Sequence, residues 1–455
     1  MNRSRPNVLV IMTDQQSATA MSCAGNTELS TPAIDSLARA GVRFEQAYCT
    51  SPLCTPSRAS MITGRLPSAL GVNDNLELVP ESFPTDTLGR LFADAGYDCA
   101  YAGKWHVPGI PHEGARSDTE ARSTSGFEEI FAGTHQGLAQ ACAGYLSAAE
   151  RQDAPFLLVA SFNEPHGICE WARSQAPPSG EVPDPDWRDL PLLPPNFAAG
   201  TEEPEALRQV QQFAWMVHPT QQWDEERWRR YRYAYQRLCE RVDAEIATLL
   251  AGLDASGLRE NTLIIFTSDH GDMQGAHRWN QKKVLYQEAA GVPFIVVPPG
   301  GENAGRTSGA LVSVGLDLLP TLCDYAGIEP AGAAPGRSVR PLVEGDPSAR
   351  APWREQVVVE TEWTFPGLMP PPAMSTLLAR LVRTERYAYL CHSWGLHREQ
   401  LFDLERDPGQ LINLATSGRH QQVLNDHRHR LREHCATGAD SRFARHVPGD
   451  GVPPR

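Results

Sequence analysis

The sequence predicts an α/β protein with a mostly parallel central sheet sandwiched by helices, followed by a small antiparallel α+β subdomain. Short apolar runs alternate with amphipathic helical stretches over most of the chain, and this alternation is typical of parallel sheets. Beyond about residue 352 the pattern changes to short strands in succession. We therefore expect a large domain over residues 1–352, a subdomain over 353–445 and a surface tail over 446–455.

The expected core strands are apolar runs that end in polar residues. A run without polar alternation is typical of a strand buried on both faces of a parallel sheet. Such runs cover residues 7–13, 97–102, 155–162, 262–267 and 292–297.

The expected helices have recognisable ends. The first follows Ser30, has Pro32 in its first turn and stops at Gly41. The second covers residues 86–95 and stops at Gly96. A long helix over residues 224–253 carries an apolar stripe at three- and four-residue steps, which predicts that it packs on the sheet.

Two segments depart from this alternation. Residues 169–223 are rich in proline and tryptophan without clear periodicity, so we expect a long loop or lid near the site. The subdomain should contain strands over 356–360 and 377–384 and a polar helix near 421–434.

Composition limits the partners and the compartment. A hydrophobic content of 41% is sufficient for a large core, and the formal charge of -14 disfavours nucleic acid or an anionic membrane as a partner. Residues 1–6 leave no room for a signal peptide, and the ten cysteines form no dense disulfide pattern. These features favour a cytoplasmic protein.

Polar residues follow four of the expected strands at their carboxyl ends. Open α/β sheets bind their ligands at this edge, so we expect these side chains to form one site. They are Asp14, Lys104, His106, His166, Asp269 and His270.

The most specific motif is Cys54-Thr-Pro-Ser-Arg58, which continues to Thr63-Gly64. Pro56 at a helix start predicts that backbone N–H groups and the positive end of the helix dipole lie beside residue 54. Arg58 adds a forked cation that could hold an oxyanion there. The alternative is that Cys54 is a small buried apolar side chain, the usual state of a free cysteine.

This motif resembles the signature of the type I sulfatases of the alkaline phosphatase superfamily, Cys-x-Pro-Ser-Arg followed by Thr-Gly. The resemblance implies that a maturation enzyme converts Cys54 to formylglycine, whose hydrate attacks a sulfate ester. A geminal diol suits this reaction, because one hydroxyl can attack sulfur and the other can later eject sulfate as the aldehyde reforms.

The pairs Asp14-Gln15 and Asp269-His270 correspond to the metal ligands of that family, together with an oxygen of residue 54. A divalent cation there would polarise a sulfate oxygen. Many members carry aspartate in place of Gln15 and an amide in place of His270. We expect Ca²⁺, with Mn²⁺ or Mg²⁺ as alternatives. Taken singly, Asp14 could be a helix cap and His270 a surface group.

The resemblance also implies roles for the remaining polar residues. Lys104 and Lys282 would hold the sulfate, His106 would act as a base, and His166 would lie near the leaving oxygen. Several fixed cations suit a transition state with delocalised negative charge. Singly, lysines are more often solvated surface groups. The segment Leu401-Phe-Asp-Leu404 resembles the closing segment of the family.

The substrate is less defined than the reaction. Tryptophans could stack on a sugar ring or simply anchor loops, namely Trp171, Trp187, Trp223 and Trp279. We expect a small-molecule or oligosaccharide sulfate ester as the partner, and a homo-oligomer is compatible with the sequence. The alternatives are a choline or aryl sulfatase, a phosphonate monoester or phosphodiester hydrolase of the same superfamily, and a binding protein in which Cys54 remains a thiol.

Overall fold

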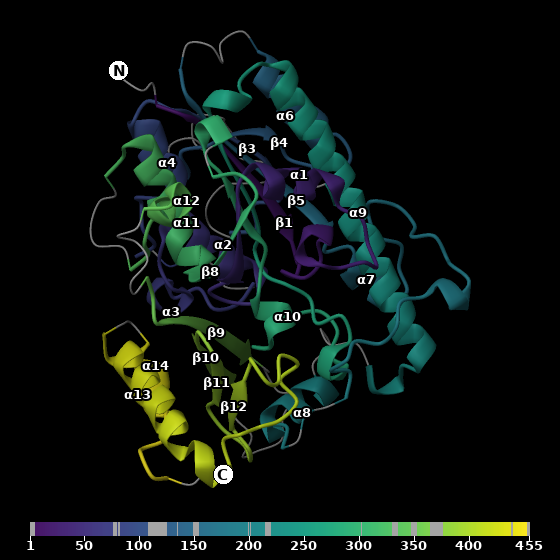
Figure 1. The fold of residues 1–455 in the computed structure, drawn as a ribbon, viewed down its shortest axis with the longest axis vertical. Coiled ribbons are helices and arrows are strands. Elements are labelled where there is room, and N and C mark those ends of the chain that lie inside the picture. The colour runs from purple at the N-terminus through teal and green to yellow at the C-terminus, as the bar shows by residue number, and fades with distance from the viewer. Residues whose placement is uncertain are drawn as a thin grey trace.

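The apolar runs form the inner strands of an eight-stranded sheet in the computed structural model (Figure 1). Its strand order is β4-β3-β5-β1-β6-β7-β2-β8. The structure describes residues 5–75, 80, 82–107, 125–133, 135–148, 154–198, 200, 202–213, 220–301, 303–329, 335–346, 353–364, 376–437 and 440–452.

The central strands are buried along their whole length, as expected for strands covered on both faces. Five neighbouring strands from β4 to β6 run parallel, whereas β7 is antiparallel to both β6 and β2. The mostly parallel sheet is therefore confirmed. The strands are β1 (Asn7–Asp14), β2 (Val42–Tyr48), β3 (Asp98–Gly103), β4 (Glu128–Phe131), β5 (Phe156–Pro165), β6 (Thr262–Ser268), β7 (Phe294–Val297) and β8 (Arg306–Ser313).

Helices cover both faces of this sheet (Figure 1). One face is covered by α1 (Pro32–Ala40), α6 (Leu138–Ser147) and the long α9 (Glu225–Ala255). The other is covered by α2 (Cys54–Thr63), α4 (Leu88–Asp94) and α11 (Val314–Ala326). Short helices complete this domain: α3 (Pro67–Leu70), α7 (Ile168–Ala172), α8 (Glu205–Phe213), α10 (Gln287–Ala290) and α12 (Arg340–Glu344).

The structure explains where helix α9 begins and where helix α1 ends. Asp224 caps α9, because its carboxylate accepts a hydrogen bond from the Arg227 N–H at 2.8 Å. Gly41 follows α1 in an extended conformation, so it is not a left-handed stop. A Cβ at Gly41 would lie 2.2 Å from the Val296 carbonyl oxygen, and this close approach explains the glycine.

The described residues of the expected lid over 169–223 include most of α7 and all of α8, two helices that the sequence did not predict. Between them, Arg229 of α9 anchors the backbone by donating hydrogen bonds to the carbonyl oxygens of Leu190 and Pro191.

The C-terminal subdomain is an antiparallel sheet of order β12-β11-β10-β9, covered by helix α13 (Figure 1). Its strands are β9 (Gln356–Thr364), β10 (Thr376–Thr384), β11 (Tyr387–His392) and β12 (Glu399–Asp403), and its helices are α13 (Gln421–Thr437) and α14 (Ser441–Ala444). Residues 448–450 of the expected tail are held on the subdomain, because Arg428 and Arg432 of α13 donate hydrogen bonds to them.

Within the described part of the chain, no helix combines the length and the apolar character needed to cross a membrane.

Candidate active site

The sheet brings the ends of four strands together. Asp14, the last residue of β1, pairs with Pro165 of β5, and Thr13 pairs with Ser268 of β6. Gly103 at the end of β3 pairs with Ser161 of β5. The residues that follow these strands, among them Lys104, His166 and Asp269, therefore emerge at one edge, as the sequence analysis expected.

Cys54 is the first residue of α2 and is fully buried at this edge. Its Sγ lies 3.2 Å from Nε2 of His270, 3.3 Å from Nζ of Lys282 and 4.0 Å from Oδ1 of Asp14. Burial and Asp14 oppose a thiolate, but Lys282, Lys104 and His270 outweigh them and hold the pKa of Cys54 well below its ordinary value. The surroundings of residue 54 thus stabilise an anion.

Arg58, one turn further along α2, ties two strand ends to this helix. Its Nη2 donates to Asp14 Oδ2 at 2.9 Å, and its Nε donates to Asp269 Oδ2 at 2.7 Å. Burial disfavours the guanidinium, but Asp269 and Asp14 raise its pKa, so it stays charged. The expectation that Arg58 holds an oxyanion at residue 54 needs correction, because its fork is directed to the two carboxylates.

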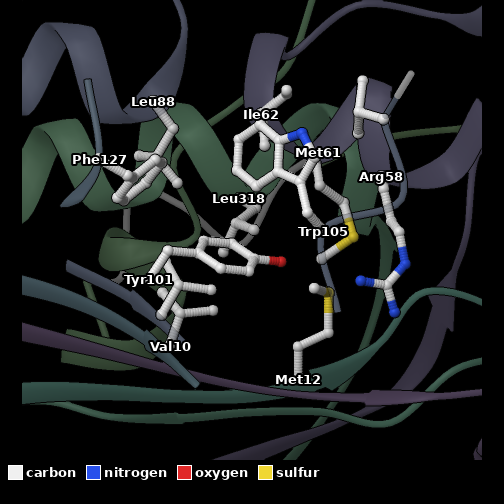
Figure 2. Close-up of a pocket in the computed structure, with 12 residues that line it drawn as sticks. Val10, Met12, Arg58, Met61, Ile62, Leu88, Tyr101, Trp105, Phe127 and Leu318 are labelled. Atoms are coloured by element: carbon white, nitrogen blue, oxygen red, sulfur yellow. The ribbon is translucent and has the colours of Figure 1, made fainter. Parts of the chain in front are cut away.

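Lys104 contacts the same carboxylate oxygen of Asp14 as Arg58 does. Its Nζ lies 2.7 Å from Asp14 Oδ2, and its carbonyl oxygen accepts hydrogen bonds from Arg58 Nη1 and the Tyr101 hydroxyl. The Tyr101 and Trp105 rings pack edge to face beside a small apolar cavity of about 30 Å³ (Figure 2). This cavity lies beneath α2 and is too small for a substrate. The side chains that line it therefore help to hold Lys104 and Arg58 in place.

The amide of Gln15 is oriented by Asp272, a residue that the sequence motifs did not single out. Its Nε2 donates to Asp272 Oδ2 at 2.7 Å, and the Tyr231 hydroxyl donates to the same oxygen. Gln15 Oε1 accepts a hydrogen bond from Lys282 Nζ at 2.7 Å. Asp272 therefore turns the amide so that its oxygen faces the site. The position of Asp272, two residues after His270, was the only available signal.

The donor atoms fit a divalent cation. One ligand atom from each of Asp14, Cys54, Asp269 and His270 lies within 4.8 Å of the others. His270 Nδ1 lies 3.0 Å from the Gly271 carbonyl oxygen, so an N–H there would donate to it and leave the Nε2 lone pair directed toward Cys54. Carboxylate and amide oxygens are hard ligands, and an imidazole is acceptable to Mn²⁺.

The two other predicted histidines approach from different loops. Burial lowers the pKa of His166 to about 3, and the nearby charges of Lys104 and Lys282 reinforce this shift. His106 has a left-handed backbone with φ of 54°, and its carbonyl oxygen accepts a hydrogen bond from Thr55 Oγ1. Among the described residues, its Nδ1 has no hydrogen-bond partner.

The predicted tryptophans do not share one surface. Trp279 is fully buried, so the expectation that it stacks on a substrate is wrong for this structure. Trp171 and Trp223 are half-buried and pack around Tyr231, whereas Trp187 is 55% exposed on the lid.

An α/β sandwich with a buried cysteine among carboxylates and fixed cations at the edge of its sheet is suited to binding an anionic ester. The model of the Sulfatase family matches residues 6–328 of this chain. The model of a second family, N-sulphoglucosamine sulphohydrolase, C-terminal, matches residues 275–437. A Delta 4,5-hexuronate-2-O-sulfatase of Bacteroides thetaiotaomicron is 30% identical over 98% of this chain and 94% of its own.

Solved structures of related hydrolases have the same fold as this chain. A 2-O GAG sulfatase superposes with a TM-score of 0.82 at 29% identity, covering 98% of this chain and 95% of its own. The phosphonate monoester hydrolase of Agrobacterium radiobacter has a TM-score of 0.77 at 23% identity over 95% of this chain and 96% of its own, which shows a shared fold. The chain belongs to the sulfatase family of the alkaline phosphatase superfamily, and it is a sulfuric ester hydrolase.

Proposed function

We propose that the enzyme hydrolyses a sulfate ester of a small sulfated saccharide through formylglycine made from Cys54. The observation that carries this proposal is the position of residue 54, which lies within hydrogen-bonding distance of Lys282 and beside Asp14 and His270. The hexuronate-2-O-sulfatase relative supports a sulfated sugar as the substrate class.

The chain's own residues supply the binding and proton steps. Lys104 and Lys282 hold the sulfate, because the Lys282 ammonium lies 3.3 Å from Cys54 Sγ and the Lys104 ammonium lies 2.7 Å from the neighbouring Asp14. One hydroxyl of the hydrated residue 54 attacks sulfur, and the alcohol leaves with a proton from Lys282, while the neutral His166 lies near the leaving oxygen. His106 removes the proton of the remaining hydroxyl, so that the aldehyde reforms and sulfate departs.

Asp14, Gln15, Asp269 and His270 would hold a divalent cation, Ca²⁺ in the first place, which would lower the pKa of the residue 54 hydroxyl and polarise a sulfate oxygen. A formylglycine-generating enzyme is the partner that the proposal requires. A cytoplasmic location and a small, imported substrate remain part of the same proposal.

The test is turnover of a substrate panel by enzyme coexpressed with a maturation enzyme. We expect release of free sulfate from a 2-O-sulfated unsaturated uronyl disaccharide or another sulfated mono- or disaccharide, and none from the Cys54→Ala variant. Choline sulfate, an aryl sulfate and an aryl phosphonate complete the panel. Faster cleavage of the phosphonate than of every sulfate would overturn the proposal.

Mass spectrometry of the peptide that contains residue 54 tests the modification separately. We expect the aldehyde or its hydrate in the coexpressed protein. An unmodified thiol throughout, together with sulfate ester binding without turnover, would support the binding-protein alternative.

A further inference from the structure

The lysines of this protein are confined to its active site. Only three of the 41 lysine and arginine residues are lysines, namely Lys104, Lys282 and Lys283. Lys282 contacts residue 54, and Lys104 contacts the neighbouring Asp14. Lys283 is 2% exposed, and nothing described so far explains why this third lysine is buried next to the second.

Every polar group of Lys283 is bound to a different segment. Its backbone N–H donates to the Pro52 carbonyl oxygen at 2.9 Å. Its carbonyl oxygen accepts hydrogen bonds from Thr361 Oγ1 at 3.1 Å and Trp363 Nε1 at 2.9 Å, both on β9 of the C-terminal subdomain. Its Nζ lies 2.5 Å from Asp74 Oδ2 and 4.8 Å from the centre of the Trp363 ring.

These contacts join Lys283 to both sides of residue 54. Pro52 precedes Cys54 by two positions, and Asn75, which follows Asp74, accepts a hydrogen bond from the Thr55 backbone N–H at 3.0 Å. Lys283 therefore fixes the relative position of Lys282 and the start of α2.

The backbone around Lys282 needs such fixation. Gln281 and Lys283 both have left-handed backbones, with φ of 59° and 77°. This conformation is unfavourable for residues other than glycine and persists where surrounding contacts enforce it. The hydrogen bond that Lys283 donates to Pro52 and those that it accepts from Thr361 and Trp363 are the contacts that enforce this conformation.

We propose that Lys283, Asp74 and Trp363 are positioning residues that hold Nζ of Lys282 against residue 54. The C-terminal subdomain thereby contributes to turnover. This inference rests on the proposed function, because it assigns Lys282 to the reaction.

Trp363→Phe tests the proposal, with Trp353→Phe as a matched control. Each variant removes one indole N–H bond to a backbone carbonyl, since Trp353 Nε1 donates to the Leu311 carbonyl oxygen at 3.0 Å. We expect Trp363→Phe to lower kcat about 10-fold with little change in KM, because misplaced groups lose transition-state stabilisation. Trp353→Phe should keep the wild-type kcat.

Combination with Lys282→Met separates positioning from general destabilisation. Trp363→Phe should cost nothing further in the Lys282→Met background, because the group that it positions is already gone. Equal losses in both backgrounds would overturn the proposal. Wild-type turnover in Lys282→Met itself would instead overturn the assignment of Lys282.

A readout independent of activity uses the small number of lysines. Protein labelled with ¹⁵N-lysine has three lysine amide signals, which can be assigned by Lys→Arg variants. Trp363→Phe should shift the signals of Lys282 and Lys283. If only the Lys283 signal moves, the change does not reach Lys282 and the proposal fails. Thr361→Val, which removes the second bond to the same carbonyl, replaces Trp363→Phe if that variant does not fold.

Discussion

The cations around residue 54 differ in how closely they are paired with carboxylates. Arg58 and Lys104 both contact Asp14 Oδ2, and Arg58 also contacts Asp269. The Nζ of Lys282 contacts the neutral oxygen of Gln15 and residue 54, and among the described residues no carboxylate lies within ion-pair distance of it. Lys282 therefore has the most charge available for a sulfate, whereas Lys104 divides its charge between Asp14 and any bound anion.

Removal of Lys104 or His166 should slow turnover. We expect Lys104→Ala and His166→Ala each to lower kcat/KM about 100-fold, which is the usual cost of losing one electrostatic or acid-base group. Steady-state kinetics on the best sulfate substrate measure this. Arg90→Ala is the control, because Arg90 pairs with Asp94 on the surface. Rates near the wild type in both site variants would remove their assigned roles.

The sequence predicted which residues gather at the site but not how they are held there. Motifs and strand ends pointed to Asp14, Cys54, Lys104, His166, Asp269 and Lys282, which the structure brings to one sheet edge. The left-handed backbones of Gln15 and His106, the anchoring of Gln15 by Asp272 and the burial of Trp279 could not be predicted. They depend on contacts between segments distant in the sequence, which local patterns do not record.

At the scale of elements, the position of α2 is determined by its packing on α11. Gly315 of α11 allows this approach, since a Cβ there would lie 2.7 Å from Thr50 and 2.9 Å from the Ser60 Cβ. Because Ser60 belongs to α2, any displacement of α11 is transmitted to the helix that begins at Cys54.

Gly315→Ala should destabilise the protein by about 1–3 kcal/mol, the usual cost of overpacking. Gly144→Ala on α6 is a matched control, because nothing lies within 4 Å of a Cβ at that position. Replacing glycine by alanine favours a helix by roughly 0.5–1 kcal/mol in both variants. The difference between their free energies of unfolding therefore measures the clash of the new Cβ with Thr50 and Ser60. Chemical denaturation of both variants measures it. Equal stability would show that α2 and α11 separate without cost.

Local periodicity predicted the type of most elements but not their pairing. Strands and helices were expected near β1, β3, β5, β6, α1 and α9, since burial on one or two faces leaves a periodic signature. The antiparallel direction of β7 and the order of the C-terminal sheet depend on how the chain crosses over, which that signature lacks. Helix α8 was not predicted, because the prolines and tryptophans around it obscured the periodicity of a short amphipathic stretch.

At the scale of the molecule, the C-terminal subdomain docks on the large domain through β9. The Glu360 N–H donates to the Thr50 carbonyl oxygen at 2.8 Å, and its carboxylate accepts hydrogen bonds from the N–H and the hydroxyl of Ser68. Arg380 lies 3.8 Å from the same carboxylate. Glu360 therefore joins both parts of the protein beside Thr361, which contacts Lys283.

The charge of Glu360 should make stability depend on pH. Burial opposes the carboxylate, but Arg380 and His434 outweigh it and lower its pKa to about 2 from an ordinary value of 4.5. A lowered folded-state pKa stabilises the protein above pH 4.5, and this contribution is lost as pH falls toward 2. Glu360→Gln should cost about 3 kcal/mol at pH 7, because it leaves Arg380 with less of its buried counter-charge.

Thermal unfolding of wild type and Glu360→Gln at pH 7 and at about pH 3.5 measures this dependence. The difference between their unfolding midpoints should be smaller at the lower pH. There the ionised Glu360 of the wild type has lost part of its contribution to the free energy of unfolding. Glu355→Gln is the control, because Glu355 pairs with Arg430 at the surface and is 65% exposed. A midpoint difference that is the same at both pH values would mean that Glu360 docks the subdomain through its hydrogen bonds to Ser68 and not through its charge.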